Sequence, residues 1–190
     1  MVDANTSADK LTYAEFLELE ISEGDTSIYE LINGEIVKRA SPNAPHQSTS
    51  FKLSGIFFVY NLEKKAGFFF AAPYDVYFDE TSAGIQPDLL FVSKERDFII
   101  QQNNGIVGAP DLIVEIVSKG SVDKDRVIKK ELYERFAVRE FWIVDPAYKS
   151  VEVYQMADHR YHLVSFAEGK GIVQSTVLPG FNLEISEIFD

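Results

Sequence analysis

The fold is decided by residues 109–117, Ala-Pro-Asp-Leu-Ile-Val-Glu-Ile-Val, which are apolar at every position after Asp111 except Glu115. Such a run is typical of a strand at the centre of a sheet that is covered on both faces. A carboxylate inside this strand costs on the order of several kcal/mol unless a cation, or protonation through a raised pKa, compensates its charge. Glu115 is therefore either half of a buried ion pair or a functional residue.

A second acid introduces the preceding apolar run, residues 89–92. Pro87 suits the start of a strand, where a missing amide does no harm, so Asp88 is expected at a strand's edge. Two strands of one sheet can bring Asp88 and Glu115 together, and paired carboxylates are typical ligands of Mg²⁺. At about 4 Å they would repel by roughly 1–4 kcal/mol. Asp88→Asn is then expected to raise the melting temperature of the metal-free protein and to abolish stabilisation by Mg²⁺.

A helix is predicted over Asp123–Phe136, between this central strand and another apolar strand at residues 140–144. Lys129 borders the apolar sector of this helix, so it can turn inward and stabilise charge on a phosphate. The alternative is a surface stripe of Asp125, Lys129 and Tyr133 at i, i+4 and i+8, an ordinary exposed ion pair beside an aromatic ring.

The remaining patterns predict one α/β domain over residues 1–190, with residues 1–10 flexible. After Lys149 the apolar residues alternate, which favours an antiparallel meander. The other predicted elements are a capped helix at 12–20, a hairpin of 28–32 and 35–38 with an Asn-Gly turn, a long and mostly buried helix at 46–65 with Phe51, Phe58 and Leu62 on one stripe, and strands at 68–70 and 74–78.

Composition limits the function. The net charge is −12, which argues against a broad nucleic-acid surface, yet residues 119–139 carry seven basic and four acidic side chains, a local +3. The alternative for this window is a solvated helix laced with ion pairs. With no cysteine, a metal would need oxygen or imidazole ligands. Neither a targeting segment nor a membrane span is predicted, so a cytoplasmic protein is expected.

Three more side chains are candidates for supporting roles near a site. His46 lies at a helix start, where a histidine more often caps or packs than binds a ligand. Glu30 and Glu35 flank the hairpin turn, although alternation alone would leave both exposed.

Taken together, the segments closely resemble the Uma-type restriction endonuclease family of the PD-(D/E)XK nuclease superfamily. The resemblance covers residues 11–189 and depends on an ordered set of motifs. These are Tyr29–Glu35, His46, Pro87–Leu89, Ala109–Ser118, Asp125 with Lys129 and Tyr133, Glu140–Pro146 and Leu178–Phe181.

The resemblance implies an α/β (α+β), restriction-endonuclease-like fold, with a mixed central sheet flanked by helices and additional antiparallel strands. It implies Mg²⁺ (or Mn²⁺) held by Asp88, Glu115 and the carbonyl of Ile116. Glu30, His46 and Tyr133 are possible supporting residues.

The superfamily pattern places a lysine two residues after the glutamate, where this chain has Val117. In the Uma-type pattern the lysine has moved to the following helix, which matches Lys129. Lys119 and Lys130 are further candidates for its role.

Two functions compete on these grounds. The first is a Mg²⁺-dependent DNA endonuclease, most simply a homodimer. The second is a catalytically inactive nuclease-like module that binds nucleic acid or a protein, which the −12 charge and Val117 favour. A soluble domain without a nucleic-acid partner is a third reading, favoured if residues 119–139 bind nothing at low salt.

Overall fold

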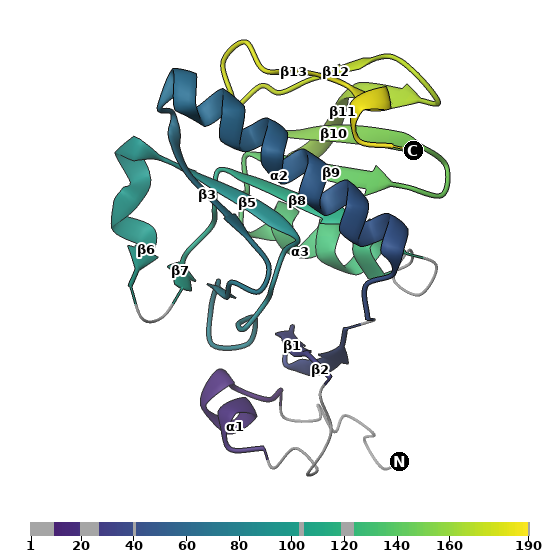
Figure 1. Ribbon diagram of the computed structural model, residues 1–190. Helices are drawn as coiled ribbons and strands as arrows, with labels where there is room; N and C mark the ends of the chain where they lie inside the picture. The colour runs from purple at the N-terminus through teal and green to yellow at the C-terminus, as the bar shows by residue number, and fades with distance from the viewer. Residues whose placement is uncertain (1–9, 20–26, 40, 103–104, 119–123, 190) are drawn as a thin grey trace.

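A six-stranded mixed sheet forms the centre of the protein (Figure 1). The computed structural model describes residues 10–19, 27–39, 41–102, 105–118 and 124–189. The strand order of this sheet is β11-β10-β9-β8-β5-β3, and among its described strands only the neighbours β8 and β9 run parallel. This architecture confirms the predicted fold class.

The helices and strands have the following bounds. The helices are α1 (Tyr13–Leu17), α2 (Ala44–Lys64) and α3 (Lys130–Arg135), with 3-10 segments η1 (Lys94–Ile99) and η3 (Ile185–Glu187) and a π-helical segment η2 (Lys124–Lys129). The central strands are β3 (Gly67–Ala71), β5 (Leu89–Ser93), β8 (Leu112–Ile116), β9 (Glu140–Asp145), β10 (Ser150–Ala157) and β11 (Arg160–Glu168). Smaller sheets pair β1 (Tyr29–Ile32) with β2 (Glu35–Lys38), β12 (Ile172–Gln174) with β13 (Asn182–Glu184), and β7 (Gly105–Val107) with both β4 (Val76–Tyr77) and β6 (Ile100–Gln101).

Two apolar cores lie on opposite faces of the sheet. Leu112 and Val114 of β8 pack with Leu53 and Phe57 of α2, while Ile113 packs in the second core with side chains of α3. Each face of β8 is therefore covered, which explains why its sequence is apolar without alternation. In Figure 1, α2 crosses the front of the sheet.

The predicted hairpin is confirmed, with Asn33 and Gly34 at φ 56° and 79° in its turn. The turn needs glycine because a Cβ on Gly34 would lie 2.5 Å from the Cβ of Lys10. Arg135 donates to the Asn33 side chain at 2.6 Å, so the hairpin is bound to α3. This docking buries Glu30 and leaves Glu35 exposed, whereas alternation alone predicted both exposed.

The predicted helix at 46–65 is confirmed as α2, but its predicted buried stripe is wrong. The buried face carries His46, Thr49, Leu53 and Phe57, while Phe51, Phe58 and Leu62 are exposed. Because α2 is apolar on both sides, its periodicity cannot decide which side meets the sheet.

Other boundaries differ modestly from the predictions. The capping box at Thr12 is present, but α1 ends at Leu17. The helix predicted over 123–136 is a π-helical turn followed by α3, and Asp123 lies outside the described residues, as do residues 1–9 of the segment predicted to be flexible. The meander of β10 and β11 is confirmed. Within the described ranges, no helix is both long and apolar enough to cross a bilayer.

Candidate active site at the end of the central strands

Glu115 lies near the carboxyl end of β8, on the sheet face that α3 covers, and is 2% exposed. Lys129 closes η2 and Tyr133 lies one turn later in α3, so both project from one side of this helical segment. Lys129 Nζ donates to Glu115 Oε1 at 3.0 Å, and the Tyr133 hydroxyl donates to the same oxygen at 2.6 Å. Both side chains are buried, which excludes the alternative of a surface stripe.

Glu30 supplies a second carboxylate to the same lysine. Its Oε1 accepts from Lys129 Nζ at 3.2 Å and from the amide of Gln86 at 2.9 Å. Glu30 reaches this place because β1 is buried along three of its four residues. Glu30, Lys129 and Glu115 are each less than 5% exposed, and this buried trio carries one net negative charge.

Asp88 stands beside Glu115 through strand register. Leu89 of β5 pairs with Val114 of β8, so Asp88 and Glu115 are the next facing positions of this antiparallel pair. Facing residues of an antiparallel pair project to the same side of the sheet. The predicted convergence of the two acids therefore follows from one register.

Asp88 has its own set of donors. Its Oδ1 forms an ion pair with Arg39, and its Oδ2 accepts from the amide of Ile116 at 2.7 Å and lies 3.1 Å from His46 Nε2. Burial raises the pKa of Asp88, but His46, Arg39 and the Ile116 amide together outweigh burial and lower it below its usual value. The pKa of Arg39 is raised, because the carboxylates of Asp88, Glu115 and Glu30 outweigh the opposing effect of burial.

These separate partners remove the reason to expect that Asp88→Asn would stabilise the metal-free protein. That expectation took the two carboxylates to be uncompensated, whereas Arg39 balances Asp88 and Lys129 balances Glu115. Removing the charge of Asp88 would leave the guanidinium of Arg39, a mostly buried group, without its partner. We therefore expect the opposite sign for this variant.

Comparison with known proteins assigns most of the chain to one family. The Uma2 family, described as "Putative restriction endonuclease", matches residues 13–186, which include every residue of this cluster. The chain belongs to the Uma2 family. Membership supports a nuclease, and the family resemblance seen in the sequence is confirmed.

Two individual proteins are similar to this Uma2 chain. The "Uncharacterized protein sll1609" of Synechocystis is 27% identical over 171 residues, covering 90% of this chain and 93% of its own. The crystal structure of a protein from Anabaena variabilis, described as "a putative nuclease belonging to DUF820", superposes with a TM-score of 0.71 at 18% identity, covering 94% of this chain and 97% of that one. The second likeness shows a shared fold.

The resemblance to the PD-(D/E)XK superfamily seen in the sequence implies a divalent metal, and the donors at this site would suit one. Asp88 and Glu115 offer hard carboxylate oxygens from neighbouring strands, and Mg²⁺ commonly uses one or two carboxylates together with water and substrate phosphate. In the described part of the chain, no three acidic or histidine side chains are placed so that they could hold one metal ion together. At Ile116 the structure shows the amide facing Asp88, and a metal-binding carbonyl stays a prediction.

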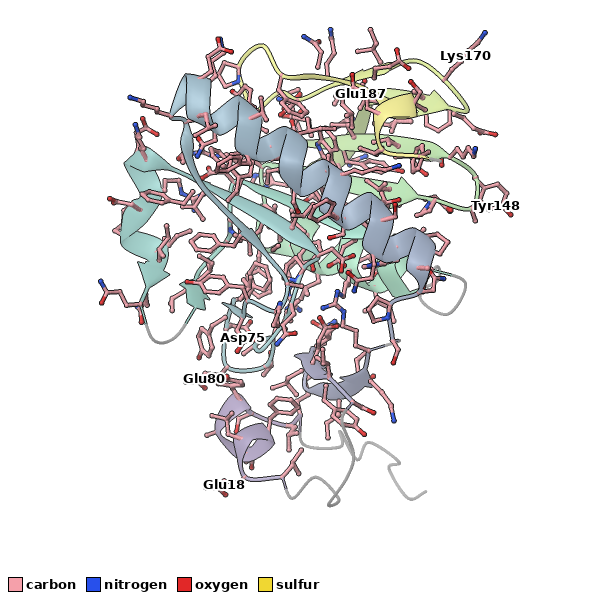
Figure 2. All side chains as sticks on the ribbon, in the orientation of Figure 1. Glu18, Asp75, Glu80, Tyr148, Lys170 and Glu187 are labelled. Atoms are coloured by element: carbon pink, nitrogen blue, oxygen red, sulfur yellow. The ribbon has the colours of Figure 1, made fainter. Side chains whose placement is uncertain are left out.

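A pocket of about 290 Å³ opens beside Asp88. Arg39, His46 and Gln86 line it, between the end of β2 and the start of α2. Among the described residues, His46 Nδ1 and Gln86 Oε1 are buried without a hydrogen-bond partner. Gln86 is held from its other side by Asp75, labelled in Figure 2, at 2.8 Å. The Arg39 cation in this pocket suits an anionic group such as a phosphate, whereas the free oxygen of Gln86 can only accept and needs a donor from a ligand or a water.

The structure sorts the remaining candidates. His46, Tyr133 and Glu30 are buried beside Asp88 and Glu115. Glu35, in contrast, is exposed. Lys130 lies over the ring of Tyr154, with its Nζ 3.8 Å from the ring centroid. Lys119 lies outside the described residues, as does the side chain of Asp125.

Sequence reasoning missed Arg39 and Gln86. Arg39 follows β2 and its amide bonds to the carbonyl of Ile28, so the hairpin that delivers Glu30 also delivers Arg39. Gln86 directly precedes the Pro87-Asp88 pair. The only sign of Gln86 in the sequence was its place next to a predicted site residue. In a single sequence, such adjacency does not separate a functional residue from a chance neighbour.

Proposed function

We propose that this Uma2 protein is a Mg²⁺-dependent endonuclease that hydrolyses phosphodiester bonds of DNA. The observation that carries the proposal is the convergence of Asp88 and Glu115 on facing positions, with Lys129 buried 3.0 Å from Glu115 and a cation-lined pocket alongside. Asp88 and Glu115 would hold Mg²⁺ or Mn²⁺, which lowers the pKa of a bound water and polarises the scissile phosphate.

Each side chain has a role that its contacts suggest. Lys129 is fixed between two carboxylates, so its ammonium is positioned in advance to orient a water or to stabilise negative charge that develops on the phosphate. Tyr133 holds Glu115 Oε1 in place. Arg39 lines the pocket and offers a planar donor suited to a phosphate oxygen, and His46 fixes the second oxygen of Asp88.

The decisive experiment compares Glu115→Gln with wild type on plasmid and single-stranded DNA, with Mg²⁺ or Mn²⁺. Lys129 contacts two carboxylates, so Glu115→Gln leaves it one and makes the trio electrically neutral. This variant is expected to fold and to lose cleavage. Glu35→Gln removes the same charge from an exposed position of the hairpin and should cleave as wild type does.

An inactive module that binds nucleic acid or a protein is the alternative function. Val117 at the superfamily's usual lysine position and the pairing of both acids with protein cations favour it. Salt-sensitive DNA binding without cleavage by the folded wild type, under either metal, would support this alternative.

A further inference from the structure

The outer face of α2 is apolar and uncovered by any described residue. Phe51, Phe58, Val59 and Leu62 are exposed by 83%, 62%, 65% and 61%. In Figure 1 this helix lies in front of the sheet along its whole length, with no described element across it. The opposite side of α2 is also apolar and packs on the first core. A helix that is apolar on both sides is typically buried on both sides.

The spacing on this face is that of a helix-pairing seam. Phe51, Gly55, Phe58 and Leu62 follow one another at intervals of four, three and four residues, the repeat by which two helices interlock. Gly55 is the gap in the seam, since a Cβ there would meet nothing within 4 Å. A neighbouring helix can therefore place a large side chain against the backbone at Gly55.

We infer that this face binds α2 of a second copy of the chain, in antiparallel orientation. In that arrangement the seam matches itself, because Phe51 meets Leu62 of the second copy and Gly55 meets Phe58. Each copy thus supplies both the large side chain and the gap, as a twofold interface requires.

The charges beside the seam favour the antiparallel direction. Lys52 and Glu63 lie on the same flank of α2, eleven residues and about 20° apart around the helix. Antiparallel pairing brings Lys52 of each copy beside Glu63 of the other, on one side of the helix pair. Parallel pairing would place the two flanks on opposite sides of the pair, so these charges would not meet. In the single chain Glu63 forms an ion pair with its exposed neighbour Lys64.

The area is sufficient for a specific dimer. Two largely exposed phenylalanines with one valine and one leucine offer about 500 Å² per copy, or about 1,000 Å² in all, where specific interfaces begin. The seam's midpoint lies about ten residues beyond His46, so the two candidate sites would stand on the order of 30 Å apart along the helices. If the proposed function holds, a dimer would then act on two separate phosphates of one duplex.

The mass in solution tests the inference independently of cleavage. By sedimentation velocity at about 100 μM, where a Kd of about 10 μM still leaves most chains paired, the full chain should have twice its 21.5 kDa mass. Phe58→Asp should be monomeric with an unchanged melting temperature at low concentration, and Phe98→Asp, on a phenylalanine of η1 that is even more exposed, should remain dimeric. A monomeric wild type, or a dimeric Phe58→Asp, would overturn the inference.

Two further variants test the geometry. Gly55→Glu improves helix propensity at an open position, so it should fold well and yet be monomeric. Lys52→Glu should weaken the dimer by roughly threefold to tenfold, and adding Glu63→Lys should restore it. No effect of Lys52→Glu would rule out the antiparallel pairing.

Discussion

Lys129 Nζ lies 3.0 Å from Glu115 Oε1, and both side chains are almost completely buried. They come from opposite ends of the connection between β8 and α3, fourteen residues apart in the chain. Strands β8 and β9 are parallel, so the helical segment between them crosses back over the sheet. Lys129 lies at the start of this crossing, next to the carboxyl end of β8. This geometry lets a lysine on a helix serve a strand glutamate when the strand itself has valine at residue 117.

Replacing Lys129 should cost more stability than replacing the lysine beside it. Lys129→Met leaves Glu30 and Glu115 buried without their shared cation, a loss expected at about 3–5 kcal/mol. Lys130→Met removes a cation that lies over the ring of Tyr154, which is worth about 0.5–1 kcal/mol. Urea unfolding monitored by tryptophan fluorescence compares the two. Similar losses would mean that the buried cation is not needed to balance the trio.

Removing one hydroxyl distinguishes a charged acceptor from a neutral one. Tyr133→Phe deletes the donor to the Glu115 carboxylate and should cost about 1.5–3 kcal/mol. Tyr161→Phe deletes a donor to the carbonyl of Val138 and should cost about 0.5–1.5 kcal/mol. Both tyrosines are buried, so the difference in unfolding free energy between them reports on the acceptor. A larger loss for Tyr161→Phe would contradict the role given to Tyr133.

A feature of the structure could be predicted from the sequence where the sequence pattern is compatible with a single arrangement. The apolar run around Glu115 could only be a central strand, and the proline before Asp88 could only suit a strand's edge, so the sheet and the meeting of the two acids were predictable. The stripe of α2 had two solutions, and the wrong one was chosen because both sides are apolar. Burial of Glu30 and the place of Arg39 depend on how the hairpin docks, which no local pattern encodes.

Asp88→Asn should lower the melting temperature of the metal-free protein, and the difference from wild type should depend on pH. The pKa of Asp88 is lowered by folding, so its ionised form adds stability that is fully present above the unfolded pKa of about 3.9. That contribution is lost as the pH falls through the lower folded pKa. Melting curves from pH 7 to pH 3 should therefore converge at the acid end. A higher melting temperature for Asp88→Asn at pH 7 would restore the view that the acids repel.

Arg39 and a metal ion compete for the same carboxylate, so Arg39→Gln should strengthen the response to Mg²⁺. In the structure the guanidinium occupies Oδ1 of Asp88, and a cation bound there must displace it or share the oxygen. The variant should melt below wild type without metal, because Asp88 then keeps His46 and the Ile116 amide but loses its ion pair with Arg39. Added Mg²⁺ should raise its melting temperature by more than it raises that of wild type, since binding no longer breaks an ion pair.

Arg96→Gln is the matched control, because Arg96 pairs with the buried Asp111, away from Asp88, and should not alter the Mg²⁺ shift. An equal Mg²⁺ shift in wild type and Arg39→Gln would mean either that Asp88 does not bind the metal or that Arg39 does not compete with it. Asp88→Asn, measured in parallel, separates these two cases. It keeps the Mg²⁺ shift if Asp88 does not bind the metal, and loses the shift if Asp88 binds it without competition from Arg39.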